Sequence, residues 1–336
     1  MRQLTFIAGA FGIGLTIWML GRFGLHDILR LIAAGGWSIP VIIIFHASQV
    51  CVSAQAWRLL AQSGRPRLSF TDFFALRCAR EGINNLLPVA QVGGEVITTR
   101  LMARRENLGI RRAAAATICD LTIELLSQVT FTLIGLGVLF CLVNRSHVTD
   151  ELMESAGAAV ALGAVFFGSQ YLGAISLVEK LLVRIAAHLG WDGVEDIRGL
   201  HAEIIALYRT HENSLRAGAL QLLGWSLGTF EVFLVLTAMG HPLSLADSFV
   251  IESVGQAAKS AGFAVPGALG VSEGGYIIIG SLFGLSPQVG IALSLIKRLR
   301  EIAWGLPSLV AWQVMEIRWI RPAPSTTGEM HLPGQS

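Results

Sequence analysis

Ionisable side chains stand inside stretches that are otherwise apolar, and they are the residues best placed to do chemistry. Asp120 and Glu124 interrupt the apolar run 113–143 and are four residues apart, so both carboxylates lie on one face of a helix. A second group comes just before the proline at position 88 and consists of Arg77, Arg80, Glu81, Asn84 and Asn85. Charges in such apolar surroundings are costly and usually face a protein interior or a cavity.

Two roles are open for these groups. Arginine presents a rigid fork of N–H donors that suits phosphate, so Arg77, Arg80 and the asparagines could bind an anionic headgroup while the carboxylates line its path. In the structural alternative, Arg77 or Arg80 neutralises Asp120 or Glu124. Likewise, Glu252 would pair with Lys259, seven residues further along its own helix. The two roles are compatible, since an ion pair can open to a ligand.

His46, Ser48 and Gln49 form a polar patch in another apolar run. We expect them to make hydrogen bonds between helices.

The composition indicates that the surrounding solvent is lipid. Of 336 residues, 53% are hydrophobic and 14% are charged, against about 25% charged in soluble domains. The formal net charge of +2 gives no reason to expect a nucleic-acid partner. The four cysteines show no spacing typical of a metal site or a disulfide framework. We therefore expect no metal and no cofactor.

The apolar segments predict an all-α polytopic membrane protein with about seven transmembrane helices. They are 3–21, 38–57, 113–143, 155–178, 217–240, 276–296 and 302–319. The last two are separated by a charged stretch that begins at Lys297. The mixed segment 176–216 is expected to lie along the membrane interface. Residues 1–321 would form a single membrane domain, followed by a disordered polar tail, 322–336. Ten arginines within 57–112 predict that this connection and the N-terminus are cytoplasmic.

The chain also contains an internal repeat. Leu68–Phe74 recurs 175 positions later as Leu243–Phe249. Each copy is followed by a proline, glycines and a glutamate, in Pro88–Glu95 and Pro266–Glu273. The repeat divides the domain into halves of about 1–143 and 151–321.

Proline and glycine interrupt a helix, so each proline-to-glutamate stretch predicts a re-entrant hairpin with a broken turn. Its apolar arms would be 73–87 and 248–265. A single long pass between the hairpins would invert the second half, and matching broken segments point to a transporter's central site. The candidate substrate-binding residues on the two hairpin turns are Pro88, Gly93, Gly94, Glu95, Pro266, Gly267, Gly270, Glu273 and Gly274.

No motif of a known enzyme class occurs in the sequence, and we name no catalytic residue. An intramembrane transferase or hydrolase that uses Glu95 and Glu273 as acid and base stays open as an alternative.

The hairpin motifs resemble a known family. The pattern R-x-x-x-N-x-L-L-P-V-x-x-V-G-G-E over Arg80–Glu95, followed by V-P-G-A-L-G-V-S-E-G-G over Val265–Gly275, resembles the flippase-like membrane family. This family includes the transmembrane region of lysylphosphatidylglycerol synthases. The similarity extends over roughly residues 5–320, and the hopanoid-biosynthesis branch is the most similar.

The resemblance implies a multi-pass protein of the bacterial inner membrane that moves or handles a lipid. The lipid would be anionic, glycosylated or a hopanoid, and lipid-biosynthetic enzymes would be partners. The family's functional positions correspond here to Arg80, Asn84, Pro88, Gly93, Gly94, Glu95, Pro266, Gly267, Gly270, Glu273 and Gly274. Synthases add a soluble aminoacyl-transferring domain, and we do not expect that activity here. Our leading hypothesis is a lipid translocase; a scaffold for lipid-biosynthetic enzymes is another alternative.

Overall fold

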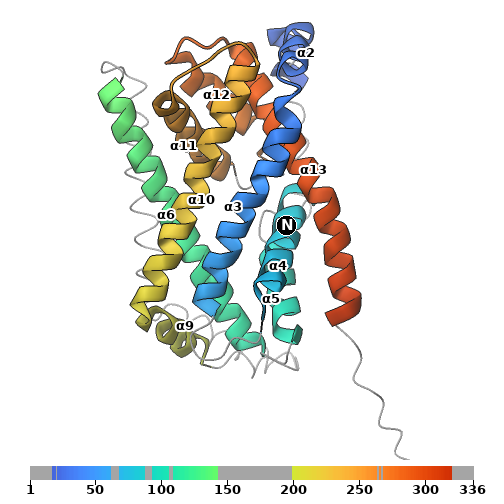
Figure 1. Cartoon of the computed structure of the whole chain (residues 1–336), viewed down its shortest axis with the longest axis vertical. Coiled ribbons are helices and arrows are strands. Elements are labelled where there is room, and N and C mark those ends of the chain that lie inside the picture. Colours follow the sequence, from blue (N-terminus) through green and yellow to red (C-terminus); the bar gives the residue numbers. More distant parts are fainter. Residues whose placement is uncertain are drawn as a thin grey trace, which may run out of the picture.

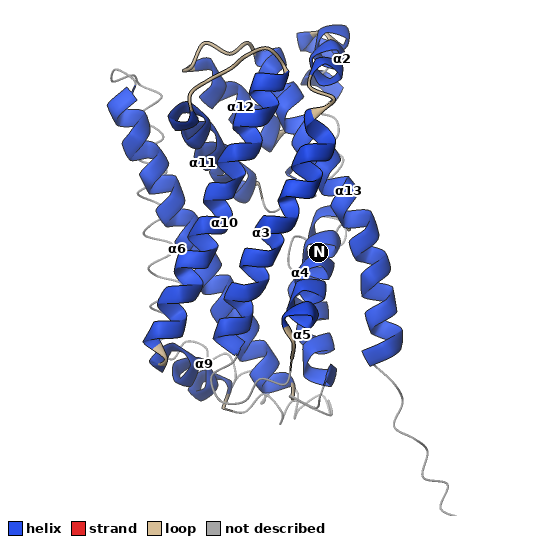
Figure 2. Ribbon diagram, in the orientation of Figure 1, coloured by secondary structure: helices blue, strands red, loops and turns tan. Residues whose placement is uncertain are grey.

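The computed structural model describes residues 17–19, 21–61, 68–87, 93–105, 109–142, 199–262, 265 and 268–319. These residues form helices and connections, with no strand among them (Figure 2). The helices are α2 (Leu25–Ala34), α3 (Ser38–Ala61), α4 (Phe70–Leu86), α5 (Gly93–Arg104), α6 (Ile110–Leu142), α9 (Leu200–Arg209), α10 (His211–Ala238), α11 (Leu245–Ala261), α12 (Val271–Ser281) and α13 (Pro287–Trp319).

Several predicted segments lie outside the described residues. They are most of 3–21, the segment 155–178, most of 176–216, the tail 322–336, and the turn residues Pro88, Pro266 and Gly267. The described part of 176–216 includes α9, whose apolar face is buried on the lower part of the bundle, mainly against α6.

Three described helices are long and apolar enough to cross a membrane: α3, α6 and α10. They correspond to the predicted passes 38–57, 113–143 and 217–240, and α6 is a single unbroken helix as expected. The prediction of an all-helical protein is therefore confirmed for the described residues, and three of its predicted passes have the length and apolar composition to cross a membrane.

The prediction that 276–296 and 302–319 are two separate passes is wrong. Residues up to Ser281 belong to α12, and α13 runs without a break from Pro287 to Trp319. The charges around Lys297 do not mark a loop because they are buried inside the bundle. Lys297 and Arg300 expose only 4% and 6% of their surface.

The repeated sequence has a direct structural meaning, since it begins the first arm of each hairpin. In α4, Ser69 accepts a hydrogen bond from the backbone N–H of Asp72, whose carboxylate accepts from the backbone N–H of Ser69. Ser244 and Asp247 make the same reciprocal cap at the start of α11. Both arms have 17 residues, about 25 Å of helix, which is shorter than the roughly 30 Å hydrocarbon core.

The two hairpins enter the bundle from opposite ends. In Figure 1, α4 and α5 run between the lower end and mid-height, whereas α11 and α12 occupy the upper end. Each hairpin is followed by a helix of 33 residues, α6 after the first and α13 after the second. Each long helix packs along the first arm of the other hairpin: α13 packs along α4, and α6 packs along α11.

The bundle contains two hydrophobic cores, one toward each end. The upper core combines α11, α12 and the first half of α13 with the upper parts of α3 and α10. The lower core combines α4, α5 and the first half of α6 with the lower parts of α3 and α10, and with α9. The charged side chains of the predicted site lie between these cores.

Candidate functional site

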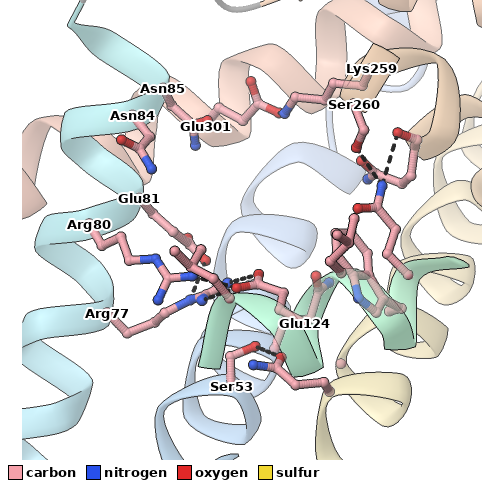
Figure 3. A pocket seen from close by; sticks show the side chains of 18 of the residues that line it. Ser53, Arg77, Arg80, Glu81, Asn84, Asn85, Glu124, Lys259, Ser260 and Glu301 are labelled. Atoms are coloured by element: carbon pink, nitrogen blue, oxygen red, sulfur yellow. Dashed lines mark hydrogen bonds and ion pairs between the residues drawn. The ribbon is translucent and has the colours of Figure 1, made fainter. Parts of the chain in front are cut away.

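A cavity of about 350 Å³ lies where the inner ends of the two hairpins approach each other. Its walls come from α3, α4, α5, α6, α10, α11 and α13. Figure 3 shows α4 on one side, presenting Arg77, Arg80, Glu81, Asn84 and Asn85, with Lys259 and Ser260 across the cavity. The structure therefore brings together residues that are more than 170 positions apart in the sequence.

The two arginines of α4 are held by the carboxylates of α6. The Arg77 guanidinium donates from both Nη atoms to the two oxygens of Glu124, at 2.9 and 2.6 Å. Arg80 donates to Glu124 and, at 2.6 Å, to Asp120. The predicted neutralisation of Asp120 and Glu124 by these arginines is confirmed, with the carboxylates one helical turn apart as expected.

Glu95, at the start of α5, closes the first hairpin onto this cluster. Its carboxylate accepts from Arg80 Nε at 3.1 Å and from Asn84 Nδ2 at 3.0 and 3.1 Å. The Asn84 side-chain oxygen in turn accepts from the backbone N–H of Gly94 at 2.8 Å. A Cβ at Gly94 would lie 2.5 Å from the Arg80 carbonyl oxygen, so only glycine permits this close approach of α5 to α4. Gly93 begins α5 beside it.

A second polar cluster joins α3, α4, α10 and α13. His46 Nε2 lies 3.0 Å from Glu81 Oε2, and Gln49 donates to Glu231 at 2.6 Å. Arg300 also donates to Glu231. The expected hydrogen bonding of His46 and Gln49 between helices is confirmed, whereas Ser48 donates to the Phe45 carbonyl of its own helix.

The predicted pair between Glu252 and Lys259 is wrong. Lys259 donates instead to Glu301, and Glu252 accepts from Lys297, both on α13. Although Glu252 and Lys259 share a helix, α13 supplies each of them with a closer partner of opposite charge.

Glu273 lies in a separate cluster on the second hairpin. Its fully buried carboxylate accepts from the backbone N–H of Gly270 at 2.8 Å and from Arg298 Nη2 at 3.1 Å. Gly270 has a φ of 79°, which favours glycine. Gly274 follows with open space at its Cβ position. Glu273 and Gly270 therefore stabilise the start of α12, and they do not line the central cavity.

Residues 5–307 match the family described as "Lysylphosphatidylglycerol synthase TM region". The chain belongs to this family. It is 23% identical over 310 residues to a protein described as "UPF0104 membrane protein" from Methanothermobacter thermautotrophicus, covering 87% of this chain and 89% of the relative. No solved structure matches. As a member of the family, the chain is a membrane-embedded protein, as the resemblance implied.

Sequence reasoning missed part of the site of this family member. Glu231, Gln221 and Arg300 were not among the candidates, yet Glu231 binds Arg300, and Gln221 donates to Asp120 at 3.1 Å. A lone carboxylate in an apolar run, as at Glu231, is a signal that could have identified it. Gln221 has no such signal, because its role depends on α10 packing against α6.

Proposed function

We propose that this protein is a lipid translocase whose central cavity receives the polar headgroup while the acyl or polycyclic tail stays in the membrane. The observation that carries the proposal is the charged cavity between the inner ends of two hairpins that enter from opposite ends of the bundle. Unpaired backbone and charged groups at membrane depth are tolerated where they line a cavity. Such a cavity gives a headgroup a polar path between the two ends.

The edge of the cavity supports entry from the lipid side. Leu121, Leu125 and Trp225 line it together with the charged groups, and Leu125 is 36% exposed on the outside of the bundle. A headgroup can occupy the polar part while its tail leaves past these apolar side chains.

We propose further that the two halves form an inverted repeat and that the lower end faces the cytoplasm. The matching helices that support the repeat are α4 and α11, of equal length, and α6 and α13, also of equal length. Arginines gather where α3, α5 and α6 reach the lower end: Arg58, Arg100, Arg104, Arg105, Arg111 and Arg112. Cytoplasmic connections carry such an excess of basic residues. The host membrane would be the inner membrane of a bacterium.

The enzyme alternative receives less support from the geometry. An acid and a base must reach the same reacting group, yet Glu95 lines the cavity and Glu273 is bonded within another cluster.

The test is movement of labelled lipids between the leaflets of vesicles that contain the purified protein. Candidate lipids are fluorescent phosphatidylglycerol, phosphatidylethanolamine, a glycolipid and a hopanoid. We expect the protein to accelerate exchange of at least one, and Asn85→Trp to block it by filling the cavity. The matched control is Ile44→Trp on the lipid-facing side of α3, where the side chain is 74% exposed. Equal exchange with and without protein for every lipid would refute the proposal.

A further inference from the structure

His46 lies on the cavity wall between two carboxylates that belong to different helices. Its Nε2 is 3.0 Å from Glu81 Oε2 on α4, and its Nδ1 is 3.7 Å from Glu231 Oε1 on α10. The residue is only 8% exposed. The ring of Trp304 on α13 meets it edge-on, with 5.4 Å between the centroids.

The two ring nitrogens are not equivalent. An ionised carboxylate only accepts hydrogen bonds, so the contact with Glu81 requires a hydrogen on Nε2. Nδ1 has no hydrogen-bond partner, although it is buried. In the neutral ring, Nδ1 therefore turns a lone pair toward Glu231. One added proton would give both nitrogens a donor hydrogen, each facing a carboxylate.

The charge balance around the cavity leaves room for that proton. Four cations belong to the described network: Arg77, Arg80, Lys259 and Arg300. They face six carboxylates: Glu81, Glu95, Asp120, Glu124, Glu231 and Glu301. With His46 neutral, these described groups carry two negative charges in excess. A cation at His46 lowers this excess, whereas it would be repelled in a site with surplus positive charge.

We propose that His46 is the proton-binding site that couples lipid movement through the cavity to a proton gradient. This inference rests on the proposed translocase function. The ring takes one proton from water in the cavity onto Nδ1 and later returns it to water reached from the other end. Protonated His46 holds α3 to both α4 and α10, while the neutral ring holds only one of them.

The groups that face His46 determine how the proton acts. Glu81 and Glu231 attract the imidazolium, and Arg300 on α13 opposes it. Arg300 is itself bonded to Glu231, so protonation of His46 makes the ring compete with Arg300 for that carboxylate. A change in this competition shifts α13 relative to α10, and both helices line the cavity.

The test uses the full-length protein in vesicles of phosphatidylethanolamine and phosphatidylglycerol, with a labelled analogue of each lipid and a trapped pH-sensitive dye. A gradient of about one pH unit should change the leaflet distribution of the transported lipid by about tenfold for each coupled proton. The dye should report proton movement together with the lipid. His46→Gln should abolish both responses, whereas His241→Gln, at an exposed position, should retain them.

Three results would overturn the coupling. The first is wild-type lipid movement that ignores the gradient, which would leave the translocase proposal intact. The second is a gradient response retained by His46→Gln. The third result is used if no tested lipid moves and the translocase proposal itself fails. It is a nitrogen NMR spectrum of labelled histidines in nanodiscs in which His46 stays in one protonation state from acid to alkaline pH. A ring that titrates, with both nitrogens shifted by Glu81→Gln and Glu231→Gln, would support proton binding without any transport assay.

Discussion

Replacing Arg80 by glutamine tests whether the charged cluster stabilises the fold as well as lining the cavity. Arg80 is 3% exposed and donates to Glu95, Asp120 and Glu124. Removing one partner of a buried ion pair costs about 3 to 5 kcal/mol, because the remaining charge stays buried without compensation. Since three carboxylates lose a donor here, we expect Arg80→Gln to lower the free energy of unfolding by about 4 to 5 kcal/mol.

The assay is reversible unfolding of the purified protein in mixed micelles, followed by circular dichroism. Adding Asp120→Asn to Arg80→Gln removes one uncompensated charge, so the double variant should recover about 1 to 2 kcal/mol. The control is Arg100→Gln, because the Arg100 side chain is 51% exposed in its pair with Glu316 and should contribute at most about 1 kcal/mol. A loss at Arg80 no larger than that at Arg100, or no recovery in the double variant, would refute the reasoning.

Two further pairs of variants probe the packing and the ion pairs of the hairpins. Gly94→Ala should lower the melting temperature by several degrees, because the new Cβ would lie 2.5 Å from the Arg80 carbonyl oxygen. The control Gly274→Ala should change the melting temperature little, because the space at its Cβ position is open. Equal shifts in the two variants would contradict the close approach of α5 to α4. Glu252→Gln and Lys297→Met should each cost about 3 to 5 kcal/mol in the same unfolding assay, and together less than their sum. Strict additivity would mean that this ion pair does not form.

The elements that could be predicted from the sequence are those determined by local pattern. The apolar lengths of α3, α6 and α10 follow from composition alone, and the repeated Ser-x-x-Asp sequence marks the start of each hairpin because the cap is made within four residues. Asp120 and Glu124 could be placed on one face since helix geometry fixes residues four apart.

What could not be predicted depends on packing between distant segments. The charged stretch that begins at Lys297 predicts a separation between two passes, because an exposed and a buried charged stretch have the same composition. Only the carboxylates of α10 and α11 show that Lys297 and Arg300 belong inside. The prediction of the partner of Lys259 is wrong for a similar reason. Glu252 lies on the same helix as Lys259, but Glu301 on the neighbouring helix α13 lies closer to it.

Each hairpin's first arm forms a buried ion pair with the long helix that follows that hairpin, and the signs of the two pairs are opposite. In the first half, a cation on the hairpin arm, Arg77, meets a carboxylate on the long helix, Glu124. In the second half, the position 175 residues after Arg77 is Glu252, and it meets Lys297 on α13. A buried charge is costly unless it is paired, so reversing both signs keeps the pair where changing one sign would break it. In these two pairs, the arm of the first hairpin supplies the cation and the arm of the second supplies the carboxylate.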